Sequence, residues 1–267
     1  MKSSPRADKS FGQHFLVNAG VVQKIVDSVA RHAGGPTAHV VEIGPGPGAL
    51  TVALLERGLR VTALEIDSRM REHLAERFAE AIGRGQLMVV EADATVFDWA
   101  AWEKSSGGAR VICGNLPYNV GTAILFSALQ QAREARAFCF MLQKEVVQRL
   151  CSGAGSKDYG VPSVLLALSC HVLDKFWVNP GSFSPPPRVD SGVMTYVRRE
   201  DVDPLLDPLN APAGFEDFSQ RLRRAFQARR KMLRKAFPGL DAEWGSKRPE
   251  DLEPETWLRL WKEGCLR

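Results

Sequence analysis

The segment VVEIGPGPGALT (residues 40–51) decides the fold, because it has the pattern of a strand, a glycine-rich turn and a helix. Its first part is apolar and rich in β-branched residues, as is typical of a parallel strand covered on both faces. Glycines at 44, 46 and 48 then let the chain turn tightly and let a ligand approach where a Cβ would clash. The segment therefore predicts a nucleotide-binding turn in an α/β sheet.

The glycine turn by itself leaves the identity of the nucleotide open. The segment also satisfies the dinucleotide fingerprint if Ala49 takes the last position, so NAD and other nucleotide-like cofactors both fit. The lysine and the serine or threonine that a P-loop needs are missing, which excludes NTP hydrolysis of that type. A glycine-rich turn without any ligand is the remaining alternative.

Two kinds of segment alternate outward from this turn. Apolar runs rich in β-branched residues predict strands, and helix-like stretches connect the first five of them. The predicted strands cover residues 39–44, 60–66, 87–92, 110–114, 135–142, 175–180 and 193–199, and a helical stretch at 161–172 precedes the sixth. Regular alternation of strand and helix favours a parallel sheet that is covered on both faces.

The composition changes near residue 200. Residues 200–214 are rich in Asp, Pro and Asn, which is typical of a domain boundary. From Phe215 onward the pattern is helical and continues to Pro238, and a shorter helix begins at Pro254. We therefore predict an α/β domain over residues 1–200 and a small helical domain over residues 201–267.

Composition and cysteine usage narrow the class of protein. The chain has 267 residues, of which 45% are hydrophobic and 25% charged, as in ordinary soluble proteins. Its apolar runs are too short to cross a bilayer, and its N-terminus lacks the apolar core of a secretory signal. The five cysteines are scattered without metal-ligand or disulfide spacing. We expect a cytoplasmic protein with reduced thiols, no membrane contact and no metal.

Polar residues follow the first four predicted strands. Gly44, Glu65, Asp93 and Asn115 each stand at the end of one of these strands. In an open α/β sheet, ligands bind at the carboxyl ends of the strands, so these four residues should share one cleft. A carboxylate about twenty residues after the glycine turn can accept both ribose hydroxyls of an adenosine. Each acid taken singly could instead cap a helix.

The sequence Asn115-Leu116-Pro117-Tyr118 after the fourth strand suits methyl transfer to the amino group of a base. Such a nitrogen is a poor nucleophile, because its lone pair is delocalised into the ring. The Asn115 side-chain oxygen and the Leu116 carbonyl could accept its two hydrogens and favour a pyramidal nitrogen. Pro117 removes a competing donor, and Tyr118 offers a face on which the base can stack. A plain β-turn is the alternative.

These blocks together resemble the ribosomal RNA adenine dimethyltransferases of the KsgA type. The resemblance runs from about Lys9 to the C-terminus, and it rests on KSFGQHFL, VVEIGPGPGALT, ALEID, EADA, GNLPYN, FMLQKEVVQRL, YGVPSV and SFSPPPRVDSGV. It implies a Rossmann-like class I methyltransferase with a seven-stranded, mostly parallel sheet, a reversed last strand and a small C-terminal helical domain. It also implies that S-adenosylmethionine is used to dimethylate N6 of two adjacent adenines in the 3′-terminal hairpin loop of 16S rRNA, within the immature small (30S) subunit.

The resemblance also implies roles for individual residues. Glu65 should hold the ribose and Asp93 the adenine amino group of the cofactor, while Phe183 should help to clamp the target base beside Tyr118. The implied cofactor contacts are His14, Leu16, Gly44, Gly46, Glu65, Asp93 and Asn115, and the implied catalytic motif is Asn115, Leu116, Pro117, Tyr118 and Phe183. The chain departs from the family at His14, where the usual residue is asparagine.

Residues 221–235 (RLRRAFQARRKMLRK) are crowded with arginine and lysine and contain no acid. Such a cluster is a candidate footprint for a polyanion, and a solvated helix face is the alternative. With an RNA substrate implied, we expect phosphate contacts. The expected contact residues are Arg221, Arg223, Arg224, Arg229, Arg230, Lys231 and Arg234.

Three other functions remain as rivals. An Erm-type enzyme that methylates an adenine of 23S rRNA shares the catalytic blocks, although the C-terminal FQARRKMLRKAF favours the KsgA type. A ribosome-assembly factor that has lost catalysis would not need the complete glycine turn, Glu65, Asp93 and the Asn115 motif. An NAD-dependent dehydrogenase fits the glycine turn alone. The sequence leaves the oligomeric state open, and we assume a monomer.

Overall fold

The computed structural model describes residues 5, 7, 13–199 and 212–267. Three predicted features lie outside the described residues, namely residues 9–12 of the first motif, the boundary at residue 200 and most of the linker. The chain forms two compact units, one from residues 1–144 and 173–197 and the other from residues 145–172 and 198–267. The contacts therefore group residues 145–172 with the C-terminal helices, whereas the sequence pattern places them in the α/β domain.

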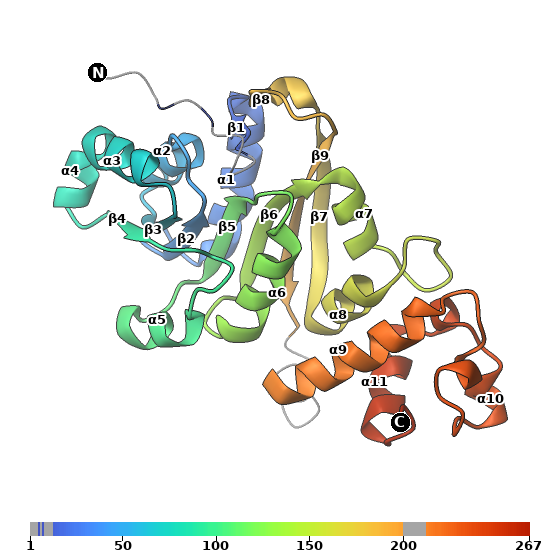
Figure 1. Cartoon of the computed structure of the whole chain (residues 1–267). Helices are drawn as coiled ribbons and strands as arrows, with labels where there is room; N and C mark the ends of the chain where they lie inside the picture. The colour runs from blue at the N-terminus through green and yellow to red at the C-terminus, as the bar shows by residue number, and fades with distance from the viewer. Residues whose placement is uncertain (1–4, 6, 8–12, 200–211) are drawn as a thin grey trace. The chain divides into compact units, whose positions relative to one another are not determined.

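The first unit is built on a mixed sheet whose strand order is β4-β3-β2-β5-β6-β9-β7 (Figure 1). Strands β2 to β6 are parallel neighbours, and β9 is antiparallel to β6. The strands are β2 (His39–Ile43), β3 (Arg60–Glu65), β4 (Leu87–Glu91), β5 (Val111–Asn115), β6 (Ala137–Gln143), β7 (Cys170–Val178) and β9 (Ser191–Arg198). The predicted seven-stranded, mostly parallel sheet with a reversed last strand is confirmed.

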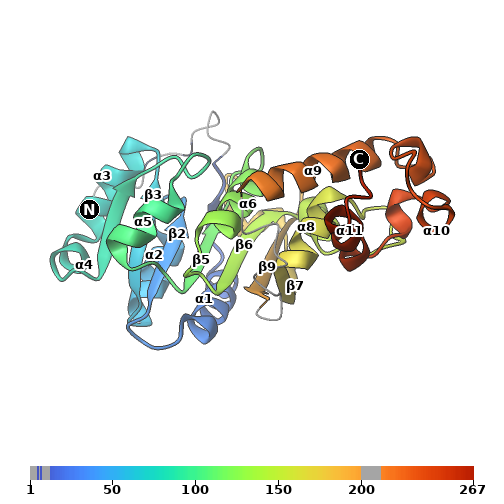
Figure 2. The same ribbon diagram turned by 90° about the horizontal axis from the view of Figure 1, so that it is seen from below.

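The central strands are covered on both faces. Consecutive residues of β2, β3, β5 and β6 are almost all buried, and side chains of a strand alternate between its two faces. Figure 2 shows these strands beside the helices that connect them. The connecting helices are α1 (Ala19–Ala33), α2 (Ala49–Glu56), α3 (Ser68–Arg77), α4 (Ala79–Gly83), α5 (Trp99–Ser106) and α6 (Gly121–Gln131).

The edge strand β7 differs from this pattern. Residues 171–175 and Trp177 are exposed, whereas Cys170 and Val178 at its two ends are buried. The strand begins at Cys170, so the prediction of a helix over 161–172 and a strand from 175 is wrong in its boundary. Pairing with the sheet overrides the local pattern here, because five consecutive exposed residues leave this strand without the alternation that reveals strands in a sequence.

Gly114 permits close approach of β5 to β2 directly before the Asn115 motif. A Cβ at Gly114 would stand 2.4 Å from the Ile43 carbonyl oxygen, a distance that no side chain can tolerate. The two strands are paired in parallel up to Ile43 and Gly114. Glycine at this position therefore brings the end of β5 against the start of the glycine turn.

A short two-stranded sheet pairs the N-terminal segment with the proline-rich loop. Strand β1 (Phe15–Leu16) runs antiparallel to β8 (Phe183–Ser184), with Phe15 opposite Ser184 and Leu16 opposite Phe183. The pairing is extended by hydrogen bonds from the Val17 and Asn18 amides to the Ser182 carbonyl. Residues 13–16 are thereby fixed to the first unit by a segment more than 160 positions away in the sequence.

The second unit is helical. Its helices are α7 (Lys144–Leu150, of which Lys144 belongs to the first unit), α8 (Val161–Ser169), α9 (Pro212–Gln227), α10 (Ala242–Gly245) and α11 (Pro254–Lys262). Helix α8 packs on α9 and α11. The helical pattern from Phe215 onward places Phe215, Phe218, Leu222, Ala225 and Phe226 on one stripe of α9, and the first four are buried while Phe226 is half-buried.

Helix α9 ends at Gln227, eleven positions before the predicted stop at Pro238. After Gln227 the chain turns, and a short 3₁₀ segment follows at Leu233–Lys235. The turn is held by tertiary contacts: Arg229 donates to Glu250 and to the Ser156 carbonyl, and the Leu233 amide donates to the Lys247 carbonyl. The sequence 228–232 has good helix propensity, and these contacts override it.

Candidate functional site

A cavity of about 320 Å³ lies at the carboxyl ends of β2, β3, β4 and β5. The residues predicted to meet there all line it, namely His14, Leu16, Gly44, Gly46, Glu65, Asp93, Asn115, Leu116, Pro117 and Tyr118. Further lining residues are Gln13, Phe15, Glu42, Ile66, Ala94 and Thr95. Thus four strand ends and the N-terminal segment enclose a single cleft, as the parallel topology requires.

The glycine turn forms one wall of this cavity. Gly46 has a φ of 54°, a left-handed conformation that disfavours a side chain, and a Cβ there would stand 3.1 Å from the Phe15 ring. Gly44 lies beside the Asn115 motif, because a Cβ added at Gly44 would be 3.8 Å from the Asn115 carbonyl oxygen. The turn therefore places bare backbone against both the N-terminal segment and the end of β5.

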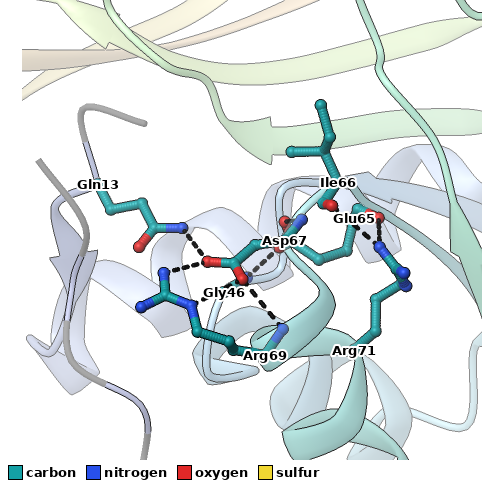
Figure 3. Close-up of polar contacts among 7 residues, drawn as sticks. All are labelled: Gln13, Gly46, Glu65, Ile66, Asp67, Arg69 and Arg71. Atoms are coloured by element: carbon teal, nitrogen blue, oxygen red, sulfur yellow. Dashed lines mark hydrogen bonds and ion pairs between the residues drawn. The ribbon is translucent and has the colours of Figure 1, made fainter. Parts of the chain in front are cut away.

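Glu65 ends β3 and organises the turn (Figure 3). Its two carboxylate oxygens accept hydrogen bonds from the Gly46 amide at 3.2 Å and from the Asp67 amide at 2.9 Å. The side chain is 4% exposed, and burial raises its pKa, although these two hydrogen bonds oppose the rise. Each carboxylate oxygen can accept a second hydrogen bond, so the group can still receive hydroxyls of a ligand.

Asp67 ties the N-terminal segment to the end of β3, as Figure 3 shows. Gln13 donates to one of its oxygens at 3.1 Å, and Arg69 donates to both oxygens at 3.0 and 2.6 Å. The Arg69 hydrogen bond is the main reason that the pKa of Asp67 is lowered. Neither Gln13 nor Asp67 was predicted as a site residue, because their contact joins segments 54 positions apart and leaves no local signal.

Asn115 has its amide oriented by the N-terminal segment. Its Nδ2 donates to the His14 carbonyl at 2.8 Å. A carbonyl can only accept, so the amide nitrogen must face His14 and the Oδ1 atom must face the other way. Among the described residues no donor to this Oδ1 is found, which leaves it available as an acceptor.

Tyr118 is fixed at two points. Its hydroxyl lies 2.7 Å from the Ser191 hydroxyl, and its ring stacks on the His14 imidazole with 5.8 Å between centroids and 25° between planes. Burial is the main cause of a raised pKa for this phenol, so the group stays protonated at neutral pH. The ring is thus a rigid wall and not a titrating group.

Asp93 stands at the cavity edge and is exposed. Its Oδ1 accepts from the Thr95 amide at 2.8 Å and from the Thr95 hydroxyl at 2.6 Å. The next helix, α5, is capped by Asp98, so Asp93 is not a helix cap. The two hydrogen bonds to Oδ1 fix the carboxylate of Asp93, while its Oδ2 remains open to a ligand.

Phe183 is the one residue of the predicted catalytic motif that the structure does not bring to the cavity. Its side chain is 4% exposed and belongs to the main hydrophobic core. The pairing of β8 with β1 at Leu16 accounts for this position. The aromatic side chain that lies against Tyr118 in the structure is His14.

Glu42 is a buried acid in the cavity wall that the sequence reading did not single out. It is 1% exposed, and Thr51 donates to it at 2.6 Å. Burial, reinforced by the nearby Glu65, raises its pKa from 4.5 to about 7 despite that hydrogen bond. It lies within the glycine segment itself, in a strand that is buried on both faces, so its position in the sequence pattern does not set it apart from core residues.

This pKa predicts that stability falls with pH. Below pH 4.5 the Glu42 carboxyl is neutral in both the folded and the unfolded protein. Between pH 4.5 and about 7 it ionises only in the unfolded protein, so the free energy of unfolding falls as pH rises. The loss is about 3 kcal/mol. Glu42→Gln stays neutral and can still accept from Thr51, so without cofactor it should be about 3 kcal/mol more stable than wild type at pH 8 and nearly equal near pH 4. Urea unfolding at both pH values measures this, and a difference that does not change with pH would contradict it.

The predicted RNA-contact residues fall into two groups within the second unit. Arg221 pairs with Asp217 and Arg229 with Glu250, and both are half-buried. The other five predicted residues are exposed, namely Arg223, Arg224, Arg230, Lys231 and Arg234. Of these, Arg223 contacts Glu216 and Arg224 lies over the Phe237 ring. The first two arginines therefore stabilise the unit, whereas the exposed ones present charge to solvent.

Two features of the described residues bear on other classes of protein. Within residues 13–199 and 212–267, no three His, Cys, Asp or Glu side chains gather as metal ligands. The same part of the chain has no helix that is long and apolar enough to cross a membrane.

Comparisons with known proteins identify the family. Residues 5–248 match the model of the family described as "Ribosomal RNA adenine dimethylase". The chain is 40% identical to the "Ribosomal RNA small subunit methyltransferase A" of Pseudomonas fluorescens, over 96% of this chain and 93% of that protein. It is 42% identical to the protein of the same name from Xanthomonas euvesicatoria, over 87% and 84%.

A solved structure extends the comparison to the fold. The crystal structure of a dimethyladenosine transferase from Plasmodium falciparum superposes with a TM-score of 0.73 and covers 94% of this chain and 99% of that one, at 24% identity. The match of the family model over most of the chain, together with these identities, leads to one conclusion: this chain belongs to the ribosomal RNA adenine dimethylase family.

Proposed function

We propose that this chain transfers methyl groups from S-adenosylmethionine to N6 of two adjacent adenines in the 3′-terminal hairpin loop of 16S rRNA, acting on the immature small subunit. It is an S-adenosylmethionine-dependent rRNA adenine dimethyltransferase by family. The single observation that carries the proposal is the orientation of Asn115, whose amide nitrogen is held by the His14 carbonyl while its oxygen is left to receive a substrate.

The cavity residues fit the cofactor. Gly44 and Gly46 line the cavity with backbone that carries no side chain, so a ligand can lie directly on the turn, in space that a Cβ would occupy. Glu65 would hold the ribose hydroxyls, and the open Oδ2 of Asp93 would accept from the adenine amino group. Leu16 and Ile66 would provide apolar contact. The bound cofactor would supply a methyl carbon that the sulfonium charge makes electrophilic.

The acceptor side is built from the Asn115 motif. Asn115 Oδ1 and the Leu116 carbonyl accept the two N6 hydrogens and so draw the lone pair of the nitrogen out of conjugation with the ring. Pro117 offers no amide donor that could occupy these acceptors. Tyr118, fixed through Ser191, gives the base a stacking face. The alkylated nitrogen loses its proton to solvent, so the site needs no strong general base.

The exposed arginines and lysine of the second unit would bind RNA phosphates. Replacing Arg230, Lys231 and Arg234 by glutamine should weaken binding to small subunits, most strongly at low salt. It should also reduce the slope of log affinity against log salt by about 2. The matched control replaces Arg60, Arg84 and Lys104, which are also exposed. Arg60 begins β3, and Arg84 and Lys104 precede β4 and β5, so all three belong to the amino ends of the first unit's strands. Equal slopes for the two triple variants, measured by filter binding, would contradict phosphate contact.

Transfer of a tritiated methyl group tests the proposed substrate. We expect label in immature small subunits and none in naked 23S rRNA. Mapping of dimethyladenine in rRNA from cells with and without this protein should then locate both modified positions in the 3′-terminal hairpin. The reverse labelling pattern would identify an Erm-type enzyme, and binding without transfer to any small subunit would identify an assembly factor.

The place of action and the assembly state follow as parts of the same proposal. The enzyme acts in the cytoplasm, where small ribosomal subunits are assembled. We propose a monomer as the active form.

A further inference from the structure

His14 occupies an unusual place in the site. It carries an aromatic side chain where the sequence resemblance leads one to expect asparagine, and it was predicted as a cofactor contact. The structure gives its backbone and its side chain separate partners. Its carbonyl receives the Asn115 amide at 2.8 Å, while its Nδ1 lies 2.9 Å from the Pro185 carbonyl.

The side chain of His14 is directed to the acceptor side of the cavity. The Pro185 carbonyl can only accept, so Nδ1 must carry the proton in this contact. The ring then stacks on Tyr118 with 5.8 Å between centroids, a separation typical of a favourable aromatic pair. Tyr118 belongs to the predicted clamp for the target base, and Pro185 directly follows the Phe183–Ser184 strand, which carries the other predicted clamp residue.

The two rings fill the space between them. A base inserted between two aromatic rings would hold the two outer rings about 7 Å apart, which is two stacking distances. Two rings in direct contact have their centroids no more than about 7 Å apart. At 5.8 Å the His14–Tyr118 pair leaves no room for a third ring. The face of Tyr118 that His14 covers is therefore closed to the base.

We propose that His14 is a positioning residue for the target adenine: its imidazole, held by the Pro185 carbonyl, covers one face of Tyr118 and so fixes the ring against which the base stacks. Ser191 fixes the hydroxyl end of Tyr118, and His14 fixes the plane of the ring. Phe183 is buried in the core and does not fill this position. The inference rests on the proposed function, and it moves the side chain of His14 from the cofactor side to the substrate side.

Three substitutions separate the parts of this contact. His14→Phe keeps a ring on Tyr118 but loses the Nδ1 hydrogen bond; His14→Asn restores the family's residue but loses the ring; His14→Ala loses both. All three keep the backbone carbonyl that holds Asn115. The control is His32→Ala, which removes a histidine from the last turn of α1, outside the cavity.

The experiment measures two quantities for each variant: the dissociation constant of S-adenosylmethionine by calorimetry, and the single-turnover rate of methyl transfer to immature small subunits at saturating cofactor. We expect cofactor affinity within twofold of wild type for all variants. The transfer rate should fall about tenfold in His14→Ala and His14→Asn, less in His14→Phe, and not in His32→Ala. A transfer rate that is higher in His14→Phe than in His14→Asn is an outcome that a general loss of folding would not produce.

Two results would overturn the inference. Cofactor affinity that falls in His14→Ala with an unchanged transfer rate would return the side chain to the cofactor site. Transfer rates equal to wild type in all three variants would remove it from the mechanism. A wild-type protein that methylates no small subunit would instead defeat the proposed function, and that failure is visible before any variant is made.

Discussion

Asn115→Ala should lower the rate of methyl transfer at saturating S-adenosylmethionine by about a thousandfold. The substitution removes the oxygen that accepts from the amino group of the target base. A fixed dipole aimed at the place where charge develops is worth two to three orders of magnitude in rate when it is lost. Single-turnover transfer of a labelled methyl group to immature small subunits measures the effect, and saturating cofactor removes the smaller contribution of weakened cofactor binding.

The protein should remain folded and bound to RNA after this change. Asn115 is half-buried, and its side chain loses one hydrogen bond, to the His14 carbonyl. Such a bond contributes about 1 kcal/mol to stability. Binding to small subunits should therefore stay within threefold of wild type, as should the control variant Asn179→Ala, which removes an exposed asparagine after β7.

Asn115→Asp is the more demanding variant. It keeps an oxygen on the substrate side but puts a second oxygen against the His14 carbonyl, where the present contact is 2.8 Å. Two acceptors repel each other, so the side chain should rotate and transfer should fall nearly as far as in Asn115→Ala. A transfer rate within threefold of wild type in either variant would show that the amide does not orient the base.

The sheet and the composition of the cleft were predictable because they follow from periodicity and topology. Parallel strands carry their last residues to one edge, so Glu65, Asp93 and Asn115 meet without any knowledge of side-chain packing. The strand ends were placed to within one or two residues for β2 to β6. The general rule for ligand sites in such sheets then fixes the location of the cavity.

What the sequence did not reveal depends on contacts between distant segments. The bond from Gln13 to Asp67 and the stack of His14 on Tyr118 join residues 54 and more than 100 positions apart. The early end of α9 depends in the same way on the contact of Arg229 with Glu250. The burial of Phe183 follows from strand pairing, which a motif in sequence does not specify. Local propensity carries no information about any of these.

Glu65→Ala should weaken S-adenosylmethionine binding by at least about a hundredfold. In the proposed role the carboxylate accepts both ribose hydroxyls, and a hydrogen bond to a charged group contributes about 1.5–3 kcal/mol. The same substitution also releases the amides of Gly46 and Asp67, which lie 3.2 and 2.9 Å from its oxygens. The glycine turn would then lose its anchor as well as its ligand contact, so both effects act in the same direction.

Glu65→Gln separates the loss of the ribose contact from the loss of the turn's anchor, because glutamine has nearly the same shape as glutamate. An amide has one accepting oxygen, whereas the Gly46 and Asp67 amides both donate, so its NH₂ group must face one of these donors. The matched control is Glu91→Gln, at the position paired with Glu65 on the adjacent strand β4. The Glu91 side chain is 74% exposed and contacts Arg71, so its loss should leave cofactor affinity unchanged.

Calorimetric titration of each variant with S-adenosylmethionine and, separately, with NAD tests the assignment. Wild type should bind S-adenosylmethionine and not NAD, as expected of a member of the ribosomal RNA adenine dimethylase family. We expect the affinity for S-adenosylmethionine to fall in the order Glu91→Gln, Glu65→Gln, Glu65→Ala. If Glu65→Gln binds as tightly as Glu91→Gln, the ribose does not lie on this carboxylate. Its burial and its raised pKa would then reflect only the anchoring of the turn.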